Sequence, residues 1–166
     1  RGLDYAPLRA LAAAGFPVDL IGPVKDYPLL PNSVRLLGPV AHEDLPEILG
    51  GYDALLLPYV DDEYNRGVIP AKTYECLATG LAVLASPLPA LAGLSGVITL
   101  CRAPQDWVDA ARALDWDSEE ARRARVAAAR EHAEESVFAR LCALVAGARR
   151  RAPAPPAAPP PPPPRR

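Results

Sequence analysis

Short apolar runs alternate with amphipathic segments along the first two thirds of the chain. The runs bounded by glycine, proline or polar residues predict buried strands at 17–21, 34–37, 53–57, 81–85 and 96–100. The segments with helical periodicity predict helices at 3–14, 42–49, 70–79 and 105–114, with a short helical turn at 88–92. Because strands alternate with helices, we expect an α/β fold with a doubly wound, mostly parallel sheet.

After residue 104 the pattern predicts helix alone. Ser118 is suited to cap a helix, and residues 121–148 predict one or two helices. The apolar stripe of this stretch consists of Val137, Leu141, Leu144 and Val145. From residue 152 proline and alanine dominate, a composition that cannot bury a core and is typical of a polyproline-like or disordered tail. We therefore expect one domain over residues 1–149 and a proline-rich disordered tail over residues 150–166.

The segment between residues 54 and 80 is the main candidate for chemistry. An apolar strand is followed by a polar loop at 59–69, and a helix then begins near Pro70 and ends at Gly80. Such a loop and helix N-terminus lie at the carboxyl edge of a parallel sheet, where open α/β folds bind ligands. The first-turn N–H groups and the helix dipole favour an anion there, typically a phosphate.

Two faces are expected on this helix. The polar face carries Lys72, Glu75 and Thr79. The opposite side carries Tyr74, Leu77 and Ala78 and is suited to packing.

The block D-D-E-Y-N-R-G-V-I-P-A-K-T-Y-E-C-L-A-T-G-L-A-V-L-A-S, at 61–86, resembles the donor-binding segment of GT-B glycosyltransferases, of family 4 or family 1 type. Those enzymes carry a pattern of the kind P-x-K-x-Y-E-Y-L-A-x-G-x-P-V-V. The resemblance covers roughly 3–145 and implies the carboxyl-terminal, donor-nucleotide lobe, a Rossmann-like half of GT-B with closing C-terminal helices. It implies transfer of a sugar from a nucleotide-diphosphate sugar to an acceptor hydroxyl, with retention and without a metal or other cofactor. The acceptor, a glycan or lipid, would be held by an amino-terminal lobe.

The resemblance also implies roles for individual residues. Glu75 would hold the ribose hydroxyls of the donor, and Lys72 would lie near its diphosphate. The backbone around Gly67, Val68 and Ile69 would cradle the phosphates. Asn65 and Arg66 in the same loop would reach phosphate oxygens or sugar hydroxyls. The nucleobase would contact the backbone of Val40 and Ala41.

Two departures from the family pattern stand out. The glutamate expected eight positions before Glu75 is replaced by Gly67, so the carboxylate that contacts the sugar would have to come from Asp62 or Glu63. The proline expected near the end of the pattern is Ala82.

Simpler interpretations remain open for each candidate. Lys72 and Glu75 also fit a surface ion pair, and Asn65 and Arg66 fit ordinary turn residues. The acidic run 61–63 resembles the metal-binding D-x-D of GT-A enzymes, although an acidic surface loop is the favoured interpretation. Two histidines are too few for a histidine metal cluster.

Composition excludes several classes of function. The chain has 166 residues, of which 50% are apolar and 23% charged, and its net charge of -2 gives no reason to expect nucleic-acid binding. No apolar run reaches the roughly 18–20 residues of a membrane span, so membrane association would be peripheral at most. The three cysteines are expected to be small buried hydrophobes in a reducing, cytoplasmic compartment.

The start of the chain suggests a fragment. It begins with Arg1, contains no methionine and opens on a helix. In the strand order 3-2-1-4-5-6 the first strand would then be missing, which leaves two unpaired inner edges. We expect such a chain to fold poorly or self-associate, and to be inactive alone. Two alternatives are a sugar-nucleotide epimerase lobe and a non-catalytic α/β binding module with a proline-rich docking tail.

Overall fold

The structure is a computed structural model that describes residues 2–24, 29–113 and 118–151, with side chains up to Leu144 in the last helix. The chain divides into two compact units, Arg1–His132 and Ala133–Arg166, each of which is described by itself. The predicted proline-rich tail lies outside the described residues. Within the described residues, no helix is both long and apolar enough to cross a membrane.

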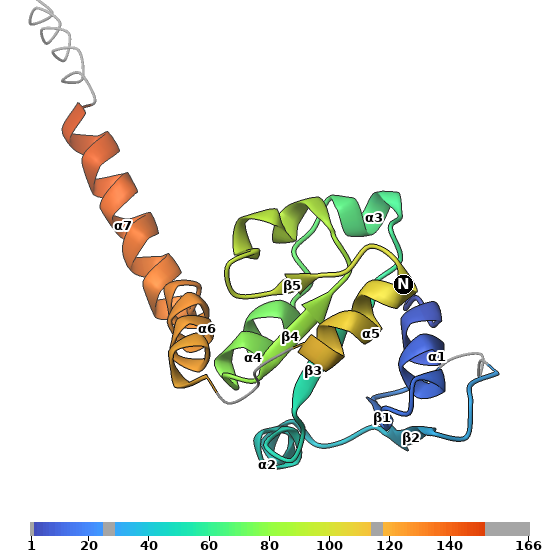
Figure 1. Cartoon of the computed structure of the whole chain (residues 1–166). Helices are drawn as coiled ribbons and strands as arrows, with labels where there is room; N and C mark the ends of the chain where they lie inside the picture. Colours follow the sequence, from blue (N-terminus) through green and yellow to red (C-terminus); the bar gives the residue numbers. More distant parts are fainter. Residues whose placement is uncertain (1, 25–28, 114–117, 152–166) are drawn as a thin grey trace, which may run out of the picture. The chain divides into compact units, whose positions relative to one another are not determined.

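The first unit alternates strands with helices, as the sequence predicts (Figure 1). Its strands are β1 (Val18–Ile21), β2 (Val34–Gly38), β3 (Ala54–Leu57), β4 (Ala82–Ala85) and β5 (Thr99–Leu100). Its α-helices are α1 (Ala6–Ala13), α2 (Leu45–Leu49), α3 (Glu63–Arg66), α4 (Lys72–Ala78), α5 (Pro104–Ala113) and α6 (Glu119–Glu131). Two 3-10 helices are η1 (His42–Asp44) and η2 (Pro89–Leu94). The second unit contains α7 (Glu134–Arg151).

The strands form two small parallel sheets instead of one. β1 pairs with β2, and β4 lies between β3 and β5. In the described part of the chain, β1 and β3 therefore each pair with a strand on one side only. This division agrees with the prediction of a doubly wound order without its first strand, because that strand would stand between β1 and β3. The mixed, parallel α/β architecture is that of a Rossmann-like half.

Two hydrophobic clusters form the core of the first unit. One joins α1 and α5 to β1 and β2 and includes Leu8, Leu11, Val18, Val34 and Trp107. The other joins α4 and α6 to β3 and β4 and includes Leu57, Leu77 and Ala129. β4 contributes to both clusters, because Leu84 belongs to the first and Val83 and Ala85 belong to the second. This alternation on a strand buried on both faces explains its uninterrupted apolar sequence.

The structure adds one helix that the sequence did not predict. The segment 59–69 was expected to be an irregular loop, but it contains α3 (Glu63–Arg66). The cause is local, because the Asp62 side chain accepts a hydrogen bond from the Asn65 N–H at 2.8 Å and so caps the helix. The predicted N-cap of α6 is confirmed, since the Ser118 hydroxyl accepts from the Ala121 N–H at 3.3 Å. The stretch 121–148 forms two helices, α6 and α7, rather than one.

The cysteine prediction is correct for two of three residues. Cys76 is half-buried and Cys101 is buried, and burial raises the pKa of each thiol to about 11. Cys142, however, is exposed on α7. A buried position was expected for it because the sequence does not reveal which side of an isolated helix is covered.

A buried carboxylate ties β1 to β2 and to the segment before β3. Arg35 donates two hydrogen bonds to Asp19, one from Nε to Oδ1 at 2.7 Å, and the Tyr52 hydroxyl donates to Oδ2 at 2.7 Å. The Asp19 side chain is only 3% exposed, whereas that of Arg35 is 66% exposed. The hydrogen bond from Arg35 lowers the pKa of Asp19 despite the opposing effect of burial.

This network predicts a pH-dependent stability. Asp19→Asn should lower the free energy of unfolding by roughly 1–3 kcal/mol at neutral pH, because it removes charge-assisted hydrogen bonds. A folded-state pKa below the unfolded value stabilises the fold at neutral pH, and that contribution is lost as the pH falls through the lowered pKa. The difference between the variant and the wild type should therefore shrink below about pH 4. Urea unfolding from pH 7 to pH 2.5 measures it.

Asp61→Asn is the matched control. Asp61 also pairs with an arginine, Arg66, but both of these side chains are exposed. Solvent screens such a pair, so we expect little change in stability at any pH. Equal effects of the two substitutions at pH 7 would contradict the prediction for Asp19.

Candidate functional site

The candidate site begins at the carboxyl end of β3. The carbonyl of Leu57, its last residue, accepts from the Ser86 N–H that follows β4 at 3.1 Å, so the ends of these strands stay together. Beyond Pro58, Tyr59 forms an isolated antiparallel bridge with Leu3. The chain then passes through α3 and enters α4, which packs against β3, β4 and α6. This arrangement agrees with the predicted order of strand, polar segment and helix.

The buried face of α4 differs from the predicted one. Leu77 is fully buried as expected and Tyr74 is half-buried, but Ala78 is exposed and Thr73 is fully buried in its place. The reason is that α4 is covered by α6 as well as by the strands, so its buried stripe runs from Thr73 to Leu77. The Tyr74 ring stacks on His132 at the end of α6, with ring centroids 4.2 Å apart.

The end of α4 is closed by its own polar groups. The Thr79 hydroxyl donates to the Cys76 carbonyl at 2.7 Å and accepts from the Leu81 N–H at 3.1 Å. Thr79 is therefore a helix-end residue that is half-buried, although the sequence placed it on the polar face with Lys72 and Glu75. Gly80 follows with a φ of 76°, a conformation that favours glycine.

Lys72 and Glu75 are brought together on the exposed side of α4. The Lys72 ammonium lies 2.7 Å from Glu75 Oε2, and the two side chains are 57% and 45% exposed. The simpler interpretation of the sequence, an i, i+3 ion pair, is therefore present in the structure. A pair this exposed contributes little to stability, so both side chains can exchange each other for a ligand at small cost.

The other polar candidates of the loop are held by internal contacts. Arg66 donates two hydrogen bonds to Asp61, at 2.6 and 2.8 Å, which lowers the pKa of Asp61 and raises that of Arg66. The Asn65 side chain is buried and donates to the Val60 carbonyl at 3.0 Å. Asn65 thus holds the loop in shape and is not directed to solvent. Of the two candidate substitute carboxylates, Asp62 caps α3, whereas Glu63 is exposed in its first turn.

The predicted phosphate cradle links α3 to α4. Gly67 ends α3 and its N–H donates to the Tyr64 carbonyl at 3.1 Å. Val68 is half-buried and Ile69 is 46% exposed. The Thr73 N–H donates back to the Pro70 carbonyl at 2.9 Å, so α4 begins at Lys72, two residues after the predicted start.

The predicted nucleobase residues belong to the other sheet. Val40 and Ala41 follow β2, whose Gly38 carbonyl accepts from the Gly22 N–H after β1 at 2.8 Å. Val40 is half-buried and Ala41 exposed, and the Ala41 carbonyl accepts from the Asp44 N–H at 3.1 Å at the start of η1. These two residues therefore follow the two-stranded sheet, while Lys72 and Glu75 follow the three-stranded one.

Two residues near the candidate site were missed by sequence reasoning. The hydroxyl of Thr73 is fully buried and has no hydrogen-bond partner among the described residues. Tyr59 is half-buried, and its pKa is raised by burial and then by the nearby Cys76 and Glu75. The position of Tyr59 directly after a buried strand was the one available indication. Thr73 carried no such indication, because its burial depends on packing between α4 and its neighbours.

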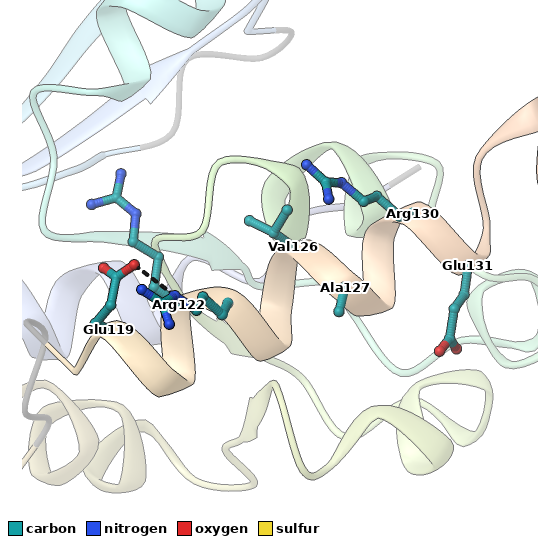
Figure 2. A pocket seen from close by; sticks show the side chains of 7 residues that line it. Glu119, Arg122, Val126, Ala127, Arg130 and Glu131 are labelled. Carbon is teal, nitrogen blue, oxygen red and sulfur yellow. Dashed lines mark hydrogen bonds and ion pairs between the residues drawn. The ribbon is translucent and has the colours of Figure 1, made fainter.

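A groove on the surface of α6 is separate from these residues. It has a volume of about 540 Å³ and is lined by residues of α6 between Glu119 and Glu131 (Figure 2). Arginines and glutamates share its lining, and Arg123 pairs with Glu119 at 3.0 Å. None of the predicted site residues lines it. Its mixed charge does not indicate a particular ligand.

Metal chemistry has no apparent location in the described chain. Within residues 2–24, 29–113 and 118–151, no three histidine, cysteine, aspartate or glutamate residues are placed to hold an ion together. The acidic residues at 61–63 are occupied differently, since Asp61 pairs with Arg66 and Asp62 caps α3.

Comparison with known proteins identifies the family. No curated protein and no solved structure matches the chain significantly. A family model described as glycosyl transferase-like matches residues 6–141, which is most of the chain. The matched range runs from α1 into α7 and includes every strand and the whole candidate site. The chain therefore belongs to the glycosyl transferase-like family.

Proposed function

We propose that residues 1–149 form the donor-nucleotide lobe of a GT-B glycosyltransferase. The whole enzyme would transfer a glycosyl group from a nucleotide-diphosphate sugar to an acceptor hydroxyl, with retention of configuration. The observation that carries the proposal is the exposed Lys72–Glu75 pair on the helix after β3, within the range that the family model matches. A glycosyltransferase family favours this function over an epimerase lobe or a non-catalytic binding module.

Lys72 and Glu75 suit two parts of such a donor. The Lys72 ammonium would pair with diphosphate oxygens, since a compact positive charge stabilises negative charge that develops on a leaving diphosphate. The Glu75 carboxylate would accept hydrogen bonds from the ribose hydroxyls. Their mutual ion pair keeps both side chains at the surface of α4 before the donor arrives. Only a weak, solvent-screened contact is exchanged when the donor binds.

The contact with the sugar itself falls to a different residue from the usual one. Gly67 supplies no carboxylate where related enzymes carry glutamate. Glu63 is the better substitute of the two acidic candidates, because Asp62 already accepts the hydrogen bond that caps α3. Arg66 would reach phosphate oxygens only after leaving Asp61. Val40 and Ala41 would contribute backbone contacts to the nucleobase, and the acceptor glycan or lipid would bind on another lobe.

Substitution of the pair tests the proposal. Lys72→Ala and Glu75→Ala should each weaken binding of nucleoside diphosphates at least about tenfold, since a charge-assisted hydrogen bond contributes about 1.5–3 kcal/mol. The thermal midpoint should hardly change, because both side chains are exposed. Isothermal titration with uridine, guanosine, adenosine and thymidine diphosphates, on the protein as encoded with its natural flanking sequence, gives the affinities.

A second exposed ion pair provides the control. Glu119→Ala and Arg123→Ala remove a pair of similar exposure on α6, and both variants should bind as the wild type does. Normal binding by Lys72→Ala and Glu75→Ala would reduce that pair to a surface salt bridge and refute the site. Loss of binding by all four variants would indicate a general structural effect and would refute it equally.

A further inference from the structure

An exposed apolar stripe runs along α7. Val137, Phe138, Leu141 and Leu144 are 46%, 64%, 55% and 71% exposed, although they are among the largest apolar side chains of the helix. α7 begins the second unit of the chain and spans Glu134–Arg151. A row of large apolar side chains at such exposure usually marks an interaction surface.

The spacing of the stripe is that of a coiled-coil seam. Val137, Leu141, Leu144 and Ala148 follow one another at intervals of four, three and four residues. These intervals correspond to heptad positions d, a, d and a, which share one face of a helix. Phe138 and Val145 both occupy position e beside the seam and widen it on one side. The helix therefore presents a face suited to another helix.

The charge of α7 reverses from one end to the other. Glu134 and Glu135 lie in its first turn, and the sequence places three arginines, at 149–151, at its end. Two such helices side by side in the same direction would place acid against acid and base against base. In opposite directions they place each acidic end against a basic end, and charges beside a seam set orientation in this way.

An antiparallel arrangement also matches the seam. The midpoint of α7 lies between residues 142 and 143. Rotation by 180° about this point places Leu141 opposite Leu144 of the second copy, and Val137 opposite Ala148. Glu134 then stands opposite Arg151. Each layer pairs an a position with a d position, as antiparallel helix pairs do.

We propose that α7 pairs with α7 of a second copy of this chain in an antiparallel, two-fold dimer. The interface is isologous, so it closes at two copies. The seam covers only about two heptads, and the association is accordingly weak. This inference does not depend on the proposed glycosyl transfer, because it uses none of the residues of the donor site.

Sedimentation equilibrium of the full chain over roughly 5–500 µM tests the proposal. The wild type should shift from monomer to dimer across this range, and Leu141→Asp should weaken the association at least tenfold. Ala143→Asp places the same residue on the opposite face of α7 and should leave the association unchanged. A wild type that stays monomeric, or two variants that behave alike, would overturn the proposal.

Charge reversal tests the orientation. The variant Glu134→Arg/Glu135→Arg and the variant Arg149→Glu/Arg150→Glu/Arg151→Glu should each associate more weakly than the wild type, because like charges then meet at both ends. An equimolar mixture of the two variants should regain the association, since every end again meets its opposite. Association of either variant alone at wild-type strength, or a mixture no stronger than its components, would contradict antiparallel pairing.

Discussion

Trp107→Ala is expected to lower the free energy of unfolding by about 3–5 kcal/mol, the largest effect of any single substitution proposed for this chain. Trp107 lies on α5, is 1% exposed and is the largest fully buried side chain. It belongs to the cluster that includes Leu8 and Leu11 of α1, and α1 and α5 pack directly against each other. Its removal would leave a cavity between two helices that both cover the sheets, so local collapse cannot fill it.

Two further variants separate this effect from a general effect of mutation. Trp107→Phe keeps an aromatic ring and should cost about 1–2 kcal/mol. Gln105→Ala, on the exposed side of the same helix, should change stability by less than about 0.5 kcal/mol. Urea unfolding followed by far-ultraviolet circular dichroism is the appropriate measurement, because the substitution removes a fluorophore. A Trp107→Ala midpoint equal to that of Gln105→Ala would show that the cluster is not the core.

Arg125→Ala is expected to have the second-largest effect, about 2–4 kcal/mol. The Arg125 side chain is 7% exposed, and its Nε donates to the Gly80 carbonyl at 2.9 Å across 45 residues of sequence. Burial lowers its pKa, yet the guanidinium keeps its proton at any ordinary pH. The substitution leaves the Gly80 carbonyl without this donor and removes the packing of the arginine stem.

The same residue links the closing helix to the candidate site. Gly80 directly follows α4, so Arg125 fixes the end of the helix that carries Lys72 and Glu75. We expect faster amide hydrogen exchange in α4 of the Arg125→Ala protein than in α1, which lies in the other cluster. Arg125→Gln retains an N–H donor without the charge and should recover part of the lost stability.

Arg123→Ala is the control for Arg125, because it lies two residues away on α6. Its side chain is 78% exposed and pairs with Glu119. Its removal should shift the urea midpoint very little. If both alanine variants unfold at the same urea concentration, the contact between Arg125 and Gly80 does not stabilise the fold.

The elements of the first unit were largely predictable because their patterns are local. The apolar runs near Val18, Leu55 and Val83 form parallel strands as expected, and Ser118 caps α6. The unpaired inner edges of β1 and β3 also follow from strand order alone. The short helix α3 was not predicted, because it depends on a single capping hydrogen bond within a polar segment.

The candidate site was predictable to the same extent. Lys72 and Glu75 are neighbours on α4 because an i, i+3 spacing places them so in any helix. The burial of Thr73 and the exposure of Ala78 were missed, since they depend on where α6 packs. Asn65 was expected to face a ligand, but its amide is directed inward to the Val60 carbonyl.

The sequence by itself determined the order of strands and helices, the α/β class and the family resemblance of the donor segment, because these depend on patterns within a few turns of chain. Tertiary structure alone decided the contacts between distant segments: Arg125 with Gly80, Asp19 with Tyr52, and Tyr74 with His132. Each of these contacts joins residues more than thirty positions apart. Their energies depend on burial and orientation, which no local pattern encodes.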